Sequence, residues 1–100
     1  MDKDIFNEDG ALWKAFKAGS EPAFGQIYRR EIQPLINYGK KLTTDRVLIQ
    51  DAVQDLFLEI WNSRSRLTDT DNIRFYLLRA LRNKLSKRMP GTDITEPKQE

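Results

Sequence analysis

The sequence of 100 residues contains no cysteine and no histidine. The absence of cysteine excludes disulfides and thiolate metal sites. The absence of histidine removes the usual general base, the commonest metal ligand and every Ser-His or Cys-His nucleophile pair. Catalysis would have to rest on carboxylates or lysines, and no close pair of them stands in an apolar setting. We therefore predict a protein that is not an enzyme, with no catalytic residue, cofactor or bound metal.

The chain also lacks a long apolar run. No stretch approaches the roughly 20 apolar residues that span a bilayer. The start of the chain, residues 1–10, is polar and acidic and does not follow the pattern of a secretory signal. We therefore expect a cytoplasmic protein without membrane contact. With 39% hydrophobic residues, the chain has enough apolar surface for one small domain with a single core.

What is present is a charge reversal between two neighbouring stretches. Residues 45–62 contain four acids and one base, for a net charge of −3. Residues 64–88 contain eight bases and two acids, for a net charge of +6. The overall formal charge of +2 conceals this contrast. An acidic helix beside a basic one indicates two different binding partners, and the basic stretch suits a polyanion.

The apolar spacing predicts four helices and no strands. A short first helix covers about residues 10–18 and ends at Gly19. A second follows a Ser20 cap and runs to about residue 42. Pro34 lies inside this second helix, so we expect a kink or break between residues 30 and 34.

The third helix is predicted to follow a cap at residues 43–45 and to end near residue 62. A polar connector, residues 63–71, leads to a fourth helix that is capped by Thr70 or Asp71 and ends near residue 88. The predicted fold is all-α: a compact bundle of three main helices with a short N-terminal helix. We expect four large side chains in its core, namely Trp13, Phe24, Phe57 and Leu81.

The predicted domain organisation has three parts. Residues 1–9 are expected to be disordered, and residues 10–88 to form the helical domain. Residues 89–100 are polar and contain prolines, so we expect a flexible tail or the start of an interdomain linker.

The third helix has one broad apolar face, which we expect to pack into the core. Its members are Ile49, Ala52, Val53, Leu56, Phe57 and Ile60. Leu58 lies on the opposite face among carboxylates and amides, with Val47 near it. An apolar centre within a polar rim is typical of a protein interface. A single exposed leucine on a soluble helix is the alternative explanation, and the periodicity leaves both open.

The fourth helix carries basic, amide and aromatic side chains on its outer face. They are Phe75, Tyr76, Arg79, Arg82, Asn83, Ser86 and Lys87. Cations contact phosphates, an amide can read a base edge, and an aromatic ring can stack on an unpaired base. We expect the aromatics and the connector to form a shallow pocket. A merely solvated helix face is the alternative.

Three segments together resemble region 2 of the sigma-70 family of RNA polymerase sigma factors, in its extracytoplasmic-function (ECF) branch. The opening helices of that domain resemble ALWKAFKAGSEPAFGQIYRR, residues 11–30. Its polymerase-binding helix resembles DAVQDLFLEIW, residues 51–61, and the helix facing the −10 promoter element resembles NIRFYLLRALRNKL, residues 72–85. Family members carry a further helix-turn-helix domain for the −35 element. Because nothing after residue 88 matches it, we expect the sequence to be a fragment containing domain 2.

The resemblance implies a sigma factor domain that binds RNA polymerase core and recognises and melts the −10 element. The residues implied to face the β′ clamp coiled coil of the polymerase are Asp51, Gln54, Asp55, Leu58 and Glu59. Those expected to contact the non-template DNA strand are Arg64, Arg66, Asn72, Phe75, Tyr76, Arg79, Arg82, Asn83 and Lys87. An anti-sigma factor is a further possible partner.

Two other function classes fit parts of the sequence. A helical repressor module would read duplex DNA in the major groove, but it would need a sharper turn than the connector of residues 63–71 provides. A protein-binding helical adaptor would leave the basic face solvated. Salt-dependent affinity for single-stranded DNA separates the adaptor from the sigma factor.

Overall fold

The computed structural model describes residues 8–89. This part of the chain forms four α-helices and a short 3₁₀ helix, with no strand. They are α1 (Asp9–Lys17), α2 (Glu21–Leu42), α3 (Arg46–Asn62), η1 (Arg64–Arg66) and α4 (Ile73–Arg88). The expected all-α fold of three main helices and a short first one is confirmed.

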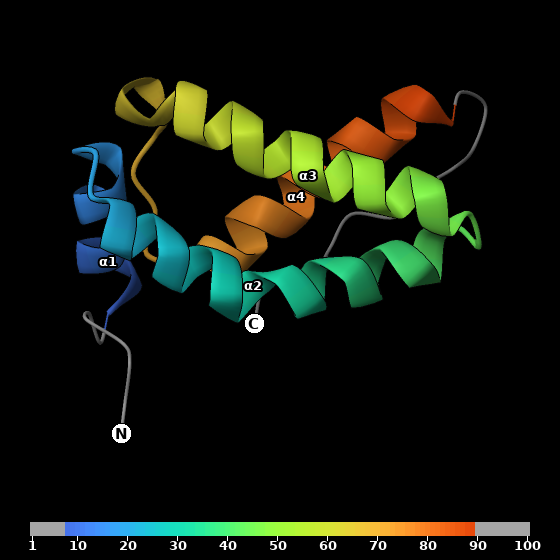
Figure 1. Ribbon diagram of the computed structural model, residues 1–100, viewed down its shortest axis with the longest axis horizontal. Coiled ribbons are helices and arrows are strands. Elements are labelled where there is room, and N and C mark those ends of the chain that lie inside the picture. The colour runs from blue at the N-terminus through green and yellow to red at the C-terminus, as the bar shows by residue number, and fades with distance from the viewer. Residues whose placement is uncertain (1–7, 90–100) are drawn as a thin grey trace.

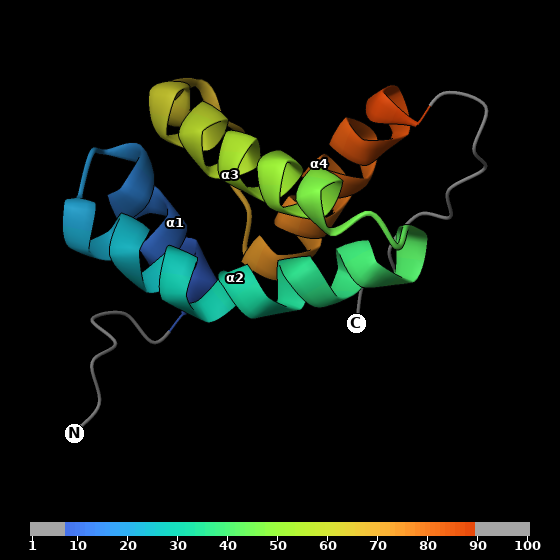
Figure 2. The ribbon, with the colours of Figure 1, turned by 45° about the vertical axis from the view of Figure 1, so that its right-hand side comes forward.

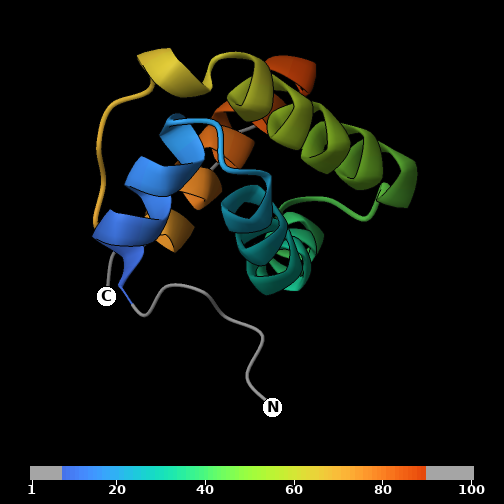
Figure 3. The same ribbon diagram turned by 60° about the vertical axis from the view of Figure 1, so that its left-hand side comes forward.

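The three long helices pack against one another, and α1 closes one end of the bundle. Figures 1 and 2 show α2 and α3 side by side and running in opposite directions, with α4 against both. Figure 3 shows α1 beside the connector that leads from α3 to α4. The connector therefore lies against α1 before it leads into α4. None of the helices in residues 8–89 is long and apolar enough to cross a membrane.

Side-chain caps fix where the long helices begin. Ser20 accepts a hydrogen bond from the backbone N–H of Ala23 at 3.2 Å, and Asp45 accepts one from the N–H of Leu48 at 3.1 Å. The predicted Ser20 cap is confirmed, and of the predicted capping residues 43–45 it is Asp45 that caps α3. The turn before Ser20 is made by Gly19, whose φ of 101° lies in the left-handed region that favours glycine.

The predicted cap of α4 was wrong. Asn72, rather than Thr70 or Asp71, caps this helix by accepting a hydrogen bond from the N–H of Phe75 at 3.0 Å. The hydroxyl of Thr70 instead accepts a hydrogen bond from the N–H of Asn72 at 3.0 Å. Thr70 therefore shapes the approach to the helix, and the cap itself lies one residue beyond the predicted pair.

The predicted domain boundaries need correction at both ends. Asp9 was expected to be disordered, but it is the first residue of α1. Met89 was assigned to the tail, yet it is half-buried and packs on the core. Apolar burial at Met89 and the tertiary contacts of Asp9 hold these residues in the domain. Residues 1–7 and 90–100 of these predicted end segments lie outside the described residues.

The helix α2 continues through Pro34 without a break, so of the predicted kink or break only the break is contradicted. Figures 1 and 2 show that the helix bends in its middle. Proline removes one backbone hydrogen bond and strains the preceding turn. The neighbouring residues Glu31 and Leu35 are each only 1% exposed. Tertiary packing on this face therefore keeps the chain helical where the local sequence favours an interruption.

The core lies between the apolar faces of all four helices. Every predicted inward residue of α3 is buried, as are Trp13 in α1 and Leu81 in α4. Phe24 was also expected in the core, but it is only half-buried because it lies at the edge of the α2–α3 contact. Helical periodicity therefore predicts the core correctly. Among these residues it is wrong only for Phe24, which lies at the edge of a helix–helix contact.

The α2–α3 contact is tight at Gly39, where an added Cβ would lie 2.8 Å from Cγ2 of Ile49. Alanine normally stabilises a helix by about 1 kcal/mol relative to glycine. Here Ile49 is itself buried, so overpacking costing about 1–3 kcal/mol opposes that gain. We expect Gly39→Ala to lower the free energy of unfolding by up to about 2 kcal/mol in urea titrations.

The matched control is Gly10→Ala, because a Cβ at this helical glycine would meet nothing within 4 Å. We expect this control to be neutral or stabilising. A stabilising effect of Gly39→Ala as large as that of the control would contradict the close contact.

Candidate functional site

The outward face of α3 carries the predicted acidic surface. Leu58 is 61% exposed and Val47 is 69% exposed, and these are the two exposed large apolar side chains among residues 8–89. Asp51, Gln54 and Glu59 are exposed around Leu58, and Asp55 is half-buried. The structure thus brings the predicted residues together on one face. An exposed leucine with a polar rim resembles the centre of a protein interface.

A groove of about 420 Å³ lies beside Leu58, between α2 and α3. Its lining residues are Glu21, Phe24, Tyr28, Gln54, Phe57, Leu58 and Trp61. Ring centroids lie 5.0 Å apart for Phe24 and Trp61, and 4.7 Å apart for Tyr28 and Phe57. The sequence analysis assigned Phe24 to the core and therefore missed its place in the wall of this groove.

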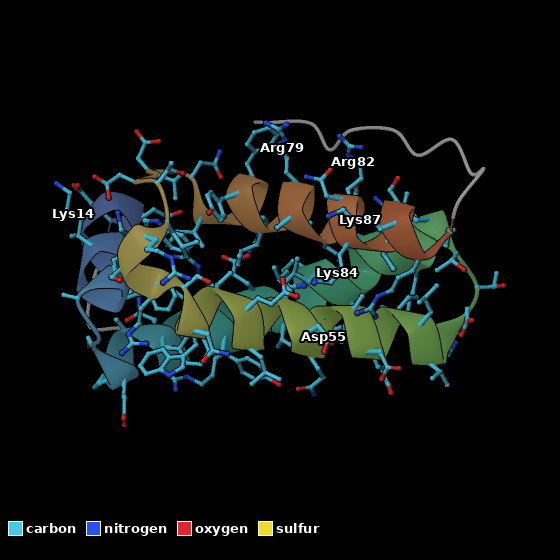
Figure 4. All side chains as sticks on the ribbon, turned by 90° about the horizontal axis from the view of Figure 1, so that it is seen from above. Lys14, Asp55, Arg79, Arg82, Lys84 and Lys87 are labelled. Carbon is cyan, nitrogen blue, oxygen red and sulfur yellow. The ribbon has the colours of Figure 1, made fainter. Side chains whose placement is uncertain are left out.

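The outer face of α4 presents cations on the side away from α3. Figure 4 shows Arg79 and Arg82 extending from α4 in that direction. Arg79 lies over the ring of Phe75, with its guanidinium carbon 5.9 Å from the centroid. Burial raises the pKa of Tyr38, and the nearby charge of Arg82 opposes that shift. Asn83 and Lys87 are exposed farther along the helix.

Two of the predicted DNA-contacting residues also support the fold. Tyr76 is half-buried, with its ring 4.9 Å from that of Trp13. Arg64 lies 4.0 Å above the ring of Trp61 and donates a hydrogen bond to the backbone oxygen of Trp61 at 2.7 Å. Arg66, by contrast, is exposed and bonds only locally to Ser63 at 3.2 Å. The Arg64 side chain therefore fixes the start of the connector.

The connector is tied to α1 at two points. The indole N–H of Trp13 donates to the backbone oxygen of Thr68 at 2.8 Å, and Lys17 pairs with Asp69 at 2.7 Å. The Lys17 hydrogen bond holds the pKa of Asp69 below its ordinary value. The hollow beside the connector, about 500 Å³, is lined by Gly10, Lys14, Asp69, Thr70 and Asp71. This hollow lies between the connector and α1, and neither Phe75 nor Tyr76 lines it.

A buried carboxylate anchors the start of α4. Glu31 is 1% exposed and accepts hydrogen bonds from Arg30 at 2.7 Å and from Arg74 at 2.8 Å. Arg30 also pairs with Asp9 at 2.9 Å, and Asp9 accepts a hydrogen bond from the N–H of Ile73 at 2.9 Å. Burial works to lower the pKa of Arg30, but the bonds with Glu31 and Asp9 outweigh it and raise the pKa.

The acidic and basic helices are connected by ion pairs, which the sequence analysis did not predict. Lys84 of α4 pairs with Glu59 of α3 at 2.6 Å, and Arg88 pairs with Asp55. Figure 4 shows Lys84 extending toward α3, opposite to Arg79 and Arg82. Lys84 and Arg88 of α4 are thus directed at the acids of α3, whereas Arg79 and Arg82 are directed away from them.

No metal-binding group is found among residues 8–89: they contain no cluster of three or more residues with metal-ligating side chains. The geometry described above offers surfaces for binding, with charged rims around apolar and aromatic side chains. Both surfaces lie on helices that are fixed by caps, ion pairs and core packing.

Of the comparisons with known proteins, the one with family models found a match. The model of the family described as Sigma-70 region 2 matches residues 27–89, which run from α2 to the end of α4. Neither the search of curated proteins nor the search of solved structures found a match. The matched residues make up more than half of the sequence and include both charged faces. The chain therefore belongs to the sigma-70 region 2 family, whose members are transcription initiation factor domains and not enzymes.

Proposed function

We propose that this is the domain of an ECF-type sigma factor that docks on RNA polymerase core in the cytoplasm and melts the −10 promoter element. One observation carries the proposal. A single small bundle displays an exposed leucine within an acidic rim on α3 and a basic, aromatic face on α4. The two faces suit two ligands that a sigma factor must hold together, a protein and a nucleic acid strand.

The polymerase-binding face in this proposal is centred on Leu58. An exposed apolar side chain gains free energy when a partner removes it from water, and the surrounding acids select a partner with basic side chains. We propose that Asp51, Gln54, Asp55 and Glu59 make these rim contacts with the β′ clamp coiled coil. An anti-sigma factor that silences the domain would have to cover this face or the DNA-binding face.

The DNA-binding face in this proposal consists of α4 and the connector. Each base that leaves the duplex loses stacking and pairing, at a cost of a few kcal/mol. Contacts with the extruded strand offset this cost. Arg79, Arg82 and Lys87 would hold phosphates, whereas Asn83 and Tyr76 have the chemistry to distinguish bases. We assign sequence preference to the amide, the aromatic ring and the connector.

The DNA-binding role is tested by salt dependence. Arg79→Ala, Arg82→Ala and Lys87→Ala are each expected to lower the slope of log affinity against log salt by about 0.7, because each removes one phosphate contact with a single strand. Asn83→Ala is expected to change the preferred sequence more than the slope. Fluorescence anisotropy with polymerase core and both separated strands of a −10 element measures these effects.

The control for this experiment is Lys41→Ala, because Lys41 is an exposed cation in the last turn of α2 and not on α4. Its slope should remain close to that of the unmodified chain. Equal affinity for both strands, with no effect of Arg82→Ala, would make the basic face a solvated surface and favour a protein-binding adaptor.

A further inference from the structure

A second groove, of about 470 Å³, runs between α3 and α4. Four side chains of α4 line it with hydrogen-bond donors, namely Asn83, Lys84, Lys87 and Arg88. Glu59 lines it from α3. The groove thus gathers three cations from one helix, two of which were outside the predicted DNA-binding set. Its chemistry suits an anion with several oxygen atoms.

The carboxylates of α3 occupy the two inward cations. Lys84 has only 15% of its side chain exposed, whereas its partner Glu59 has 63% exposed. Arg88 and its partner Asp55 have 31% and 46% exposed. In both pairs the acid is more open to solvent than the base. An incoming protein can therefore reach the acids at the rim without first displacing the bases.

We propose that the α3–α4 groove binds the sugar–phosphate backbone of single-stranded DNA, and that Glu59 and Asp55 compete with its phosphates for Lys84 and Arg88. With both acids paired, three bases and two acids leave the groove a net charge of +1. When basic groups of another partner neutralise both acids, the charge of the three bases, +3, is available to bind phosphates. The groove then extends the DNA-binding face of α4 toward its C-terminal end.

This inference rests on the proposed function, because Asp55 and Glu59 are also proposed to contact polymerase. A polymerase side chain that bonds these carboxylates loosens their hold on Lys84 and Arg88, and DNA bound to the two cations frees the carboxylates for polymerase. The coupling must be reciprocal, since it is a difference in binding free energy between two sites. Each site therefore strengthens the other.

The effect of each pair is small and measurable. Exposed ion pairs have modest interaction energies, so releasing one cation should tighten DNA binding about two- to fivefold. It should also steepen the salt slope by about 0.7, the value for one added phosphate contact on a single strand. Removing any acid makes the protein more positive and so strengthens DNA binding even without an ion pair. A single variant is therefore not sufficient evidence.

A double-mutant cycle separates the two effects. The full chain without polymerase is titrated with fluorescent oligothymidylate, a probe of backbone contacts. We expect Glu59→Gln to tighten binding about two- to fivefold and Lys84→Gln to weaken it. In the Lys84→Gln background, Glu59→Gln should change binding no more than Glu21→Gln does. Glu21 is an exposed acid at the start of α2, outside the α3–α4 groove, and serves as the matched control.

The pair of Asp55→Asn and Arg88→Gln provides an independent second cycle. If Glu59→Gln tightens binding equally with and without Lys84, the effect is general electrostatics and the inference is overturned. In that case Arg79 and Arg82 would still determine DNA binding, and the proposed function would remain. A chain that binds no single strand, even with polymerase core present, would overturn both.

Discussion

Replacing Leu58 by arginine is expected to reduce binding of this domain to RNA polymerase core by at least about 30-fold, with the fold intact. Truncating or blocking an interface hot spot typically costs 2 kcal/mol or more, and each 1.4 kcal/mol is a factor of ten in affinity. Leu58 is 61% exposed and is the apolar centre of the proposed face. Arginine would remove that apolar contact and place a cation against a partner that is expected to be basic.

The fold should tolerate this change because the Leu58 side chain lies outside the core. Val47→Arg is the matched control: Val47 is 69% exposed and lies on α3, near its start. Val47→Arg makes the same change in charge but lies away from Leu58, so we expect a much smaller loss of affinity for polymerase core. Pull-down with polymerase core measures binding, and thermal unfolding followed by circular dichroism checks the fold. Undiminished binding of Leu58→Arg would refute the assignment of this face.

Replacing Trp13 by alanine is expected to lower the free energy of unfolding by about 3–5 kcal/mol. The Trp13 side chain is fully buried, and its ring lies 5.0 Å from that of Phe16 and 4.9 Å from that of Tyr76. Its indole N–H donates to the backbone oxygen of Thr68 at 2.8 Å. Small domains have total stabilities of about 5–15 kcal/mol, so this loss would remove a large part of the free energy of unfolding.

Trp13→Phe separates packing from hydrogen bonding. Phenylalanine keeps most of the buried aromatic surface but cannot donate to Thr68, so we expect a smaller loss, about 1–3 kcal/mol. Urea unfolding followed by far-UV circular dichroism measures both variants.

Because α1 holds the connector through this bond, Trp13→Phe should also weaken discrimination between DNA sequences more than it weakens overall affinity. Equal stability of both variants would show that the ring contacts contribute little.

The local sequence determined the helices and which way their faces point. On α3, the apolar spacing identified every buried residue and left Leu58 outside, as the structure confirms. The cap at Ser20 and the capping segment 43–45 could be recognised because a cap bonds to a backbone N–H only three residues later. These features depend on neighbours within one or two helical turns. Therefore the sequence alone was enough to predict the fold class and the two charged faces.

The charge partners, by contrast, were decided by the tertiary structure. The pairs Glu31–Arg74 and Glu59–Lys84 join residues that are 43 and 25 positions apart, and Asp9 bonds to the backbone of Ile73 over 64 positions. No periodicity within one helix specifies which charge on another helix it will meet. The distance between two such groups depends on how the helices cross, which is set by core packing.

The same reason explains the two grooves and the continuous helix at Pro34. Phe24 and Tyr28 line a groove, and Asn83 and Lys84 line another, only because α3 packs against both α2 and α4. The tendency of Pro34 to interrupt α2 is local, and buried contacts on either side of it overcome that tendency. Short-range hydrogen bonds and apolar periodicity depend on residues that are close together in the sequence, so the sequence alone predicts them. Long-range ion pairs and grooves form only when the core has fixed the positions of the helices.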